Sequence, residues 1–253
     1  MNYFASLETA KRYATSRPYF HPVVMEQLQA QGIHAHRALD VGCGTGLSSR
    51  ALSKIADHII GFDLAEAMVL FAQQEAQNED YLTASGEEFP FPATYFDLVT
   101  VSSVFHWLDR KKFMAQSHRV LKPGGHLVVY DNYFQSQMQE DAHFQDRFKS
   151  AYFTRYPSPR RAPVEFSSED GFEVIHHEIY TNDVEFTQDA LTFYLMTQSN
   201  VIAQLENGRE SFDSAYAWIH TLVAPYFPEG VKRTFRYKGP IWILKPHSTG
   251  NLF

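Results

Sequence analysis

The sequence predicts an α/β protein with a doubly wound, mostly parallel sheet. Strand patterns alternate with helical patterns through the first half of the 253 residues, and this alternation is typical of parallel strands joined by right-handed crossover helices. A glycine cluster at 42–46 stands between one strand pattern and the helical pattern after it. The apolar share of 44% is enough to bury a full core. We expect a single domain over residues 1–253.

The first half contains the expected elements in turn. A helical pattern at 7–31 is interrupted at Arg17-Pro18 and at Pro22, because proline disrupts a helix interior. Short apolar runs predict the strands, and apolar residues repeated along one face predict the helices. Strands are expected at 38–41, 58–63, 96–103 and 126–130, and helices at 47–55, 65–77 and 111–121. Residues 122–125, Lys-Pro-Gly-Gly, predict a turn before the last of these strands.

The second half changes character. Residues 135–163 are rich in aromatic side chains, glutamine, arginine and proline, which indicates a helical and irregular insertion rather than sheet. We expect one strand or two at 172–186, helices at 188–206 and 211–226, and a closing strand or hairpin at 233–245 around Gly239-Pro240. The two mainly helical stretches, 134–165 and 188–230, are expected to form a cap subdomain.

Composition excludes several classes of protein. The net charge of −7 disfavours a non-specific nucleic-acid binder, which needs a basic surface. One cysteine excludes an internal disulfide framework and a cysteine-rich zinc site. No apolar run approaches the roughly 20 residues that span a bilayer, and residues 1–5 lack a signal-peptide pattern. We therefore expect a cytoplasmic protein with no metal, no membrane partner and no nucleic-acid partner.

The glycine cluster is the most informative segment. It reads Asp40-Val-Gly42-Cys-Gly44-Thr-Gly46 after a strand and before a helix. Glycine lets backbone amides approach a ligand that a Cβ atom would hold off, and the helix N-terminus adds partial positive charge. The second strand ends at Asp63, where an acid accepts hydrogen bonds from ribose hydroxyls. The spacing is Gly-x-Gly-x-Gly, whereas the dinucleotide fingerprint is Gly-x-Gly-x-x-Gly.

This segment resembles motif I of class I S-adenosylmethionine (SAM)-dependent methyltransferases, and four further motifs follow in the order that the family shows. These motifs are Gly61-Phe-Asp-Leu64, Gly86-Glu-Glu-Phe-Pro-Phe91, Phe96-Asp-Leu-Val99 and Leu121-Lys-Pro-Gly-Gly125. The resemblance is to the ubiquinone/menaquinone and biotin-pathway group. Phe105-His106-Trp107, with Tyr13 and Arg17-Pro18 upstream, narrows it towards the trans-aconitate methyltransferase-like subgroup. It implies a seven-stranded Rossmann-like sheet, with the last strand antiparallel, and a partly helical cap.

The resemblance also implies a cofactor site for SAM and its product S-adenosylhomocysteine. The cofactor-binding residues that it predicts are Tyr13, Arg17, Asp40, Gly42, Cys43, Gly44, Gly46, Asp63, Leu64, Ser85, Gly86, Glu87 and Ser102. Two positions depart from the family pattern: Ser85 stands where an acid often contacts the adenine, and Ala65 replaces a small hydroxyl residue. Cys43 is interpreted as a small filler of the loop and not as a nucleophile.

The acceptor side is expected where the fourth strand ends. His106 and Trp107 follow that strand, at the edge where open α/β sheets bind ligands. His106 is the candidate catalytic residue, because it could orient the acceptor or remove its proton. Tyr133 and Arg155 complete the expected acceptor pocket, with Arg160 and Arg161 near Arg155. Arginine forks match carboxylates, although a solvated basic loop explains the same arginines.

These features predict a SAM-dependent methyltransferase that acts on a small molecule, with a carboxylic acid as the leading acceptor. Methyl transfer from a sulfonium needs alignment and exclusion of water more than it needs a catalytic triad. Two alternatives stay open. One is a SAM-binding regulatory or partner subunit without catalysis, and the other, disfavoured by the glycine spacing, is a nucleotide-dependent oxidoreductase.

Overall fold

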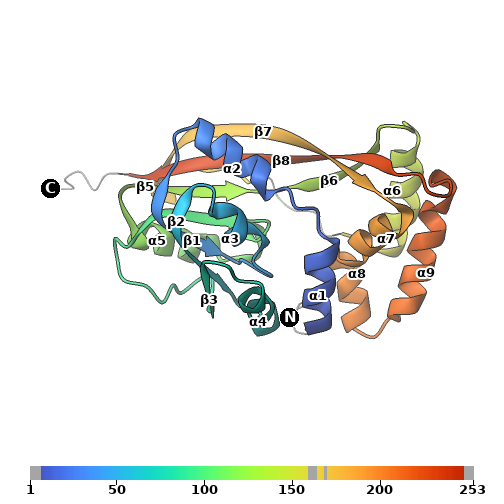
Figure 1. The fold of residues 1–253 in the computed structure, drawn as a ribbon, viewed down its shortest axis with the longest axis horizontal. Helices are drawn as coiled ribbons and strands as arrows, with labels where there is room; N and C mark the ends of the chain where they lie inside the picture. The colour runs from blue at the N-terminus through green and yellow to red at the C-terminus, as the bar shows by residue number, and fades with distance from the viewer. Residues whose placement is uncertain (1–6, 159–163, 168–169, 248–253) are drawn as a thin grey trace. The chain divides into compact units, whose positions relative to one another are not determined.

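The computed structural model describes residues 7–158, 164–167 and 170–247, and Figure 1 traces their order along the chain. These residues divide into two compact units. The described residues within Tyr19–Asn132, Ala162–Tyr180 and Gly239–Phe253 form the sheet unit, and those within Met1–Pro18, Tyr133–Arg161 and Thr181–Lys238 form the helix-rich unit. The segments predicted to form a cap, 134–165 and 188–230, lie largely in the helix-rich unit, which also takes the N-terminal helix.

The sheet unit has the predicted doubly wound architecture. Its strands run in the order β3-β2-β1-β4-β5 and pair in parallel, and β8 pairs with β5 in the antiparallel direction. The parallel strands are β1 (Ala35–Val41), β2 (Ala56–Asp63), β3 (Glu79–Thr83), β4 (Phe96–Ser102) and β5 (Leu121–Tyr130). The α/β class and the reversed last strand are therefore confirmed.

The helices of this unit connect parallel strands, except for α2, which precedes β1, as Figure 1 shows. They are α2 (His21–Ala30), α3 (Leu47–Leu52), α4 (Glu66–Gln74), the 3-10 turn η1 (Phe105–Trp107) and α5 (Arg110–Val120). Apolar side chains of β1 such as Ala38, Leu39 and Val41 are fully buried, because a parallel strand is covered on both faces. Pro22 lies in the first turn of α2, where proline is tolerated. The break in the helical pattern that was expected at Pro22 is therefore the start of α2.

Two strands of the described chain were not expected. β3 carries Glu79 and Asp80 and so lacks the apolar run that marked the other strands; it lies at the end of the sheet order, where one side of a strand is open. β6 (Tyr133–Met138) extends into the stretch 135–163, which was predicted not to be sheet. That prediction is wrong for β6, because β6 pairs with β8, the same strand that pairs with β5.

The long strand β8 (Arg233–Pro246) makes this continuation possible. Tyr130 of β5 pairs with Ile241, and Tyr133 of β6 then pairs with Lys238. β8 is therefore one strand of 14 residues, and a hairpin at Gly239-Pro240 is excluded. The glycine serves a close approach instead, since a Cβ atom on Gly239 would lie 1.6 Å from the Asp131 carbonyl oxygen. β7 (Phe172–Phe186) is also a single strand, and it pairs with β8.

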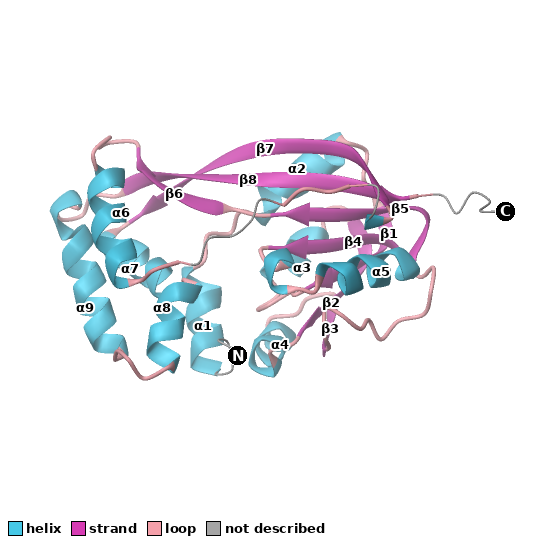
Figure 2. Cartoon of the chain, turned by 180° about the vertical axis from the view of Figure 1, so that it is seen from behind, coloured by secondary structure: helices cyan, strands magenta, loops and turns pink. Residues whose placement is uncertain are grey.

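The helix-rich unit is built around aromatic side chains. Its helices are α1 (Leu7–Ser16), α6 (Phe144–Arg155), α7 (Gln188–Met196), α8 (Ser199–Glu206) and α9 (Phe212–Val223), and Figure 2 shows α6 to α9 gathered as one group. The expected helix at 188–206 is two helices, divided at Thr197-Gln198. The aromatic members of the buried cluster are Phe144, Phe148, Tyr152, Tyr156, Phe186, Tyr194, Phe227, Phe235 and Tyr237. Core packing therefore accounts for much of the aromatic content of the second half.

Candidate functional site

The glycine loop connects β1 to α3 in the sheet unit. Gly42 and Cys43 donate their backbone N–H groups to the carbonyl of Phe62, at 2.8 and 3.0 Å, which holds the loop against the end of β2. Gly42, Gly44 and Gly46 all have positive φ angles, of +69°, +54° and +82°. Residues with a Cβ atom rarely adopt this conformation, so the backbone path itself explains why glycine occurs three times.

The three glycines face different surroundings. A Cβ atom on Gly42 would lie 2.7 Å from Val104, and one on Gly46 would lie 2.5 Å from the Tyr81 hydroxyl. A Cβ atom on Gly44 would meet nothing within 4 Å. Internal packing therefore requires Gly42 and Gly46 to be small, whereas Gly44 borders open space beside the loop.

Asp63 lies next to that open space. Its Oδ2 atom accepts the Gly44 N–H at 3.0 Å, and its Oδ1 atom accepts the Ala65 N–H at 2.8 Å. Burial raises the pKa of Asp63, although these backbone donors oppose the rise. A carboxylate oxygen accepts more than one hydrogen bond, so Asp63 keeps capacity for two ligand hydroxyls. Leu64, the next residue, is 67% exposed, which is unusual for leucine and provides an apolar surface beside the acid.

Asp40 is held inside the protein. Its carboxylate is fully buried and accepts hydrogen bonds from the hydroxyls of Ser48 at 2.6 Å, Ser49 at 2.7 Å and Thr100 at 3.0 Å. Burial raises the pKa of Asp40 to about 6, and the three hydroxyl donors oppose the rise. Its observed contacts join β1 and β4 to the first turn of α3, and its predicted contact with a cofactor stays a prediction.

The buried hydroxyl of Thr45, which is 1% exposed, has no hydrogen-bond partner in the described structure. The Ser102 hydroxyl, in a residue that is 7% exposed, is hydrogen-bonded to the Tyr130 side chain. A buried polar group without a partner costs free energy, and a bound polar ligand would satisfy it. Cys43 differs, because burial raises the pKa of its thiol well above the ordinary value; this agrees with a filler and not with a nucleophile.

The other predicted cofactor residues form the turn after β3. Ser85 Oγ accepts the Glu87 N–H at 3.2 Å, and Glu87 Oε1 accepts the Asp109 N–H at 3.0 Å. A Cβ atom on Gly86 would lie 2.6 Å from Leu108. The turn is thereby fixed to the segment that follows η1. Its contact with adenine stays a prediction.

His106 and Trp107 form η1 just after β4, and their rings lie 5.2 Å apart. Trp107 is 51% exposed, so its ring provides an apolar surface at the carboxyl end of the sheet. The neighbouring Phe105 is buried in the core and anchors the turn. The catalytic role of His106 stays a prediction.

Four predicted site residues belong to the helix-rich unit. The Arg17 guanidinium donates to the Thr197 carbonyl at 2.8 Å and lies 4.6 Å from the centre of the Tyr13 ring. Arg155 forms an ion pair with Glu210 at 2.5 Å, and Tyr133 is 40% exposed on β6. Arg160 and Arg161 lie outside the described residues. The roles of Tyr13 and Arg17 at the cofactor, and of Tyr133 and Arg155 at the acceptor, stay predictions.

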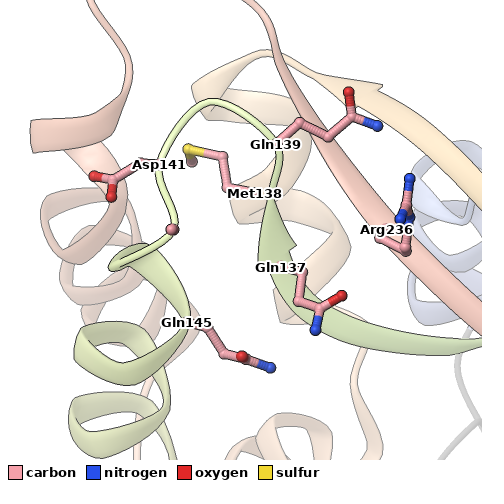
Figure 3. A pocket seen from close by; sticks show the side chains of 7 residues that line it. Gln137, Met138, Gln139, Asp141, Gln145 and Arg236 are labelled. Atoms are coloured by element: carbon pink, nitrogen blue, oxygen red, sulfur yellow. The ribbon is translucent and has the colours of Figure 1, made fainter.

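The helix-rich unit also has two hollows. One, of about 370 Å³, is lined by glutamines and by Arg236, which Figure 3 shows from close by. Two of its polar side chains have an internal partner, since Asp183 accepts hydrogen bonds from both Arg236 and Gln139. The other, of about 590 Å³, is lined mainly by α1, by the end of β7 and by α7, and includes Arg17. No residue of the glycine loop lines either hollow.

Sequence reasoning missed a group of polar residues at the carboxyl ends of β4 and β5. Ser103 donates to Asp131 at 2.8 Å, and Tyr130 is hydrogen-bonded to the buried His21 at 3.0 Å. Burial lowers the pKa of His21 to about 3, so this imidazole is neutral at physiological pH. The available signal was positional, because Ser103 and Asp131 each stand directly after a buried strand.

Residues 39–129 match the family model described as a methyltransferase domain, and they include β1, the glycine loop, Asp63 and most of β5. This region is a methyltransferase domain. With the relatives below, this match supports the resemblance to the class I SAM-dependent methyltransferase group.

Two relatives each match about half of the chain or less. The chain is 30% identical over 158 residues to the ubiquinone/menaquinone biosynthesis C-methyltransferase UbiE of Vibrio vulnificus, a match that covers 51% of the chain and 61% of the relative. It is 34% identical over 108 residues to the biotin biosynthesis bifunctional protein BioHC of Cellvibrio japonicus, covering 42% of the chain and 21% of the relative. The chain thus spans less than two thirds of these relatives.

A solved structure shows the same fold over more of the chain. A proposed type II methyltransferase from Anaeromyxobacter dehalogenans superimposes with a TM-score of 0.65 and 22% identity, and the match covers 88% of this chain and 94% of that one. The fold likeness therefore includes segments beyond residues 39–129. Among the described helices, none is long and apolar enough to cross a membrane.

Proposed function

We propose that this methyltransferase-group protein binds SAM at the glycine loop and transfers its methyl group to a small-molecule acceptor. The observation that carries the proposal is the open face of Gly44 beside the Asp63 carboxylate. A ligand with vicinal hydroxyls fits this arrangement, because Asp63 has acceptor capacity where the loop leaves room. The buried hydroxyl of Thr45 supplies a further polar group that a cofactor would satisfy.

The residues of the chain would divide the work as follows. Asp63 would accept the ribose hydroxyls, Gly44 would let the backbone approach, and Leu64 would pack against the adenine. SAM, when bound, supplies a methyl group on a sulfonium, which makes that carbon electrophilic. The protein's part is then to align the acceptor and to exclude water, for which Trp107 offers an apolar wall and His106 a polar group.

The finer proposal of a carboxylic acid acceptor rests on Arg155. A carboxylate that binds this guanidinium has to compete with Glu210, which already pairs with it. If Arg155 nevertheless holds an acid, then Arg155→Ala should raise the acceptor's KM and leave SAM affinity unchanged. The same proposal includes Tyr133, Arg160 and Arg161. Substitution of each by alanine should likewise raise the acceptor's KM and leave SAM affinity unchanged.

Titration calorimetry tests the cofactor site. SAM and S-adenosylhomocysteine should bind with micromolar affinity, on the order of −8 kcal/mol. Asp63→Ala should weaken binding by about 1 to 3 kcal/mol, because hydrogen bonds to a charged group are lost. Binding of a nicotinamide cofactor without binding of SAM would contradict the proposal.

Gly124 provides a matched control for Gly44. Both have a positive φ and open space around the Cβ position, but Gly124 lies in the stretch Lys122–Gly125, remote in sequence from the loop. Gly44→Ala and Gly124→Ala should therefore lower stability by similar amounts, about 1 kcal/mol. Only Gly44→Ala should weaken SAM binding, by roughly tenfold or more, and equal affinities in the two variants would argue against a cofactor at Gly44.

Turnover separates an enzyme from a SAM-binding partner subunit. A screen of metabolites for release of S-adenosylhomocysteine should find an acceptor. Tight SAM binding with no release for any acceptor would favour the subunit without catalysis.

A further inference from the structure

The carboxyl ends of β4 and β5 bring together two polar residues that the cofactor site does not use. The strands pair in parallel, with Ser102 opposite Tyr130, so the residues that follow them, Ser103 and Asp131, leave the sheet side by side. The Ser103 hydroxyl donates to Asp131 Oδ1 at 2.8 Å. This is the sheet edge at which open α/β folds bind their ligands.

Ser103 is held in an unfavourable backbone conformation. Its φ is +58°, in the left-handed region that residues with a Cβ atom avoid. Two contacts maintain it, the hydroxyl bond to Asp131 and a bond from the Ser103 N–H to the Tyr130 carbonyl at 3.1 Å. Such strain persists where the surroundings over-determine it, and it is concentrated at functional sites.

Asp131 is also held in place by residues other than Ser103. Its N–H donates to the Pro240 carbonyl at 3.2 Å, and its own carbonyl accepts the Tyr180 hydroxyl at 2.8 Å. Gly239 packs so closely on this carbonyl that no side chain could replace its hydrogen. Asp131 is 9% exposed, and its Oδ1 atom also accepts the Asn132 N–H at 3.1 Å. The backbone and one carboxylate oxygen are thus set before any ligand arrives.

The strained turn is also continuous with the glycine loop. Val104, the residue after Ser103, packs against the Cα atom of Gly42, where a Cβ atom would lie 2.7 Å away. Ser102, the residue before it, carries a buried hydroxyl that is hydrogen-bonded to Tyr130, the residue before Asp131. One short segment, 102–104, therefore connects the cofactor loop to the Asp131 carboxylate.

We propose, on the basis of the proposed function, that Asp131 is the general base for the acceptor, and that Ser103 is the positioning residue that orients it. The acceptor then reacts through an O–H or N–H group. As the acceptor atom bonds to the methyl carbon, the bond from carbon to sulfur breaks and its electron pair stays on sulfur. The proton of the acceptor passes to the Asp131 carboxylate, which later releases it to water.

This assignment selects among acceptor classes. A carboxylate nucleophile beside Asp131 would place two negative charges together, which is unfavourable at low local dielectric, and it has no proton for a base to remove. An acid can still be a substrate if its carboxylate lies away from Asp131 and an O–H or N–H group attacks. The attacking group, rather than the overall charge of the acceptor, is what the proposal specifies.

Ser103→Gly and Asp131→Asn separate catalysis from folding. Glycine favours a φ of +58°, so Ser103→Gly should keep or raise stability while it removes the hydroxyl that orients Asp131. A merely structural contact predicts unchanged turnover in Ser103→Gly, whereas our proposal predicts a kcat lowered by about tenfold with the acceptor's KM little changed. Asp131→Asn still offers an oxygen to Ser103, and its kcat should fall on the order of 100-fold or more.

The assay uses 2-phenylethanol, phenethylamine and phenylacetate as acceptor probes at saturating SAM. Calorimetry on each variant first confirms unchanged SAM affinity, so that loss of the cofactor site is distinguished from loss of the base. We expect release of S-adenosylhomocysteine with the alcohol or the amine and not with the acid. The decline of kcat at low pH should disappear in Asp131→Asn and persist in His106→Ala.

Several results would overturn the proposal while SAM binding stays intact. One is methylation of phenylacetate alone, and another is full activity of Asp131→Asn. A third is a decline of kcat at low pH that disappears in His106→Ala and persists in Asp131→Asn. If no probe is methylated, each is titrated into the complex with S-adenosylhomocysteine. Asp131→Asn should then weaken binding of the alcohol or the amine severalfold, and absence of any such binding in the wild-type protein also overturns the proposal.

Discussion

The two units of this protein differ in where their acids lie. In the sheet unit, acids stand at strand ends and accept hydrogen bonds from backbone or hydroxyl groups, as Asp63 does from Gly44 and Asp131 does from Ser103. In the helix-rich unit, charged residues pair with one another around an aromatic core, as Arg155 does with Glu210. Ion pairs such as Arg110–Asp170 and Lys122–Asp97 occur in the sheet unit as well. The sheet unit is therefore set apart by the acids at its strand ends, where a ligand could be bound.

The largest expected effect tests whether the two units are energetically distinct. Phe235 is fully buried in the helix-rich unit, with its ring 5.2 Å from Phe144 and 5.9 Å from Phe186. Phe235→Ala should lower the free energy of unfolding by about 3 to 5 kcal/mol, because it leaves a cavity. Hydrogen exchange should show the loss of protection mainly in α6, α7 and α9.

Phe96→Ala is the matched control, since Phe96 is equally buried in the core of the sheet unit. It should cost a similar free energy but lower protection in β1, β4 and β5. If both variants lose protection over the same residues, the two units unfold as one and the comparison between them fails for stability.

The next effect concerns pH and belongs to the sheet unit. The pKa of Asp40 is about 6 in the folded protein, above the ordinary value near 3.9 for the unfolded chain. The folded state therefore binds more protons between these values. This contribution to stability is complete below about pH 4 and is lost as pH rises through 6, by on the order of 3 kcal/mol.

Asp40→Asn isolates this contribution, because asparagine does not titrate. The free energy of unfolding is measured by urea denaturation from pH 4 to pH 7.5 for the wild-type protein and for Asp40→Asn. As pH rises over this range, the wild-type protein should lose stability relative to Asp40→Asn. His21 acts with the opposite sign, since burial lowers its pKa to about 3 and its contribution grows as pH rises. Only the difference curve is therefore informative, and a flat one would contradict a buried, ionising Asp40.

The same contrast explains how much the sequence could predict. Four of the five parallel strands and the glycine loop follow from local signals, the fold class and the reversed last strand are confirmed, and residues 39–129 match a methyltransferase domain. β6 and the unbroken β8 depend on a partner about 100 residues away in the chain. Gly239-Pro240 has the composition of a turn, yet Gly239 is required by contact with Asp131, and no local pattern indicates such a contact.

The site shows the same division. Asp63 and Gly44 were predicted together, and they are in contact. Ser103 and Asp131 were missed, because a serine after one strand and an aspartate after another carry no joint signal until the sheet order is known. Arg155 was expected to be available to an acceptor, but its pairing with Glu210, 55 residues later, is a tertiary contact that local sequence does not reveal.

The smallest expected effects lie in the helix-rich unit, where two ion pairs differ in their surroundings. Glu210 is 12% exposed and accepts hydrogen bonds from Arg155, Tyr156 and Ser214. Burial alone would raise the pKa of Glu210, but these donors outweigh it and lower the pKa. Its contribution to stability is therefore present at neutral pH and is lost as pH falls through the lowered value.

Glu210→Ala should cost about 1 to 2 kcal/mol, because it leaves partly buried donors without an acceptor. Asp183 and Arg236 are 36% and 42% exposed, and an ion pair so open to solvent contributes only about 0.2 to 1 kcal/mol. Asp183→Ala should therefore shift the free energy of unfolding less than Glu210→Ala does, and 0.5 M salt should reduce its effect further, because screening acts on exposed charges. Equal costs for the two variants, both insensitive to salt, would show that burial does not distinguish these pairs. A fall in SAM affinity in either variant would show that the ion pairs of the helix-rich unit support the cofactor site as well as its own fold.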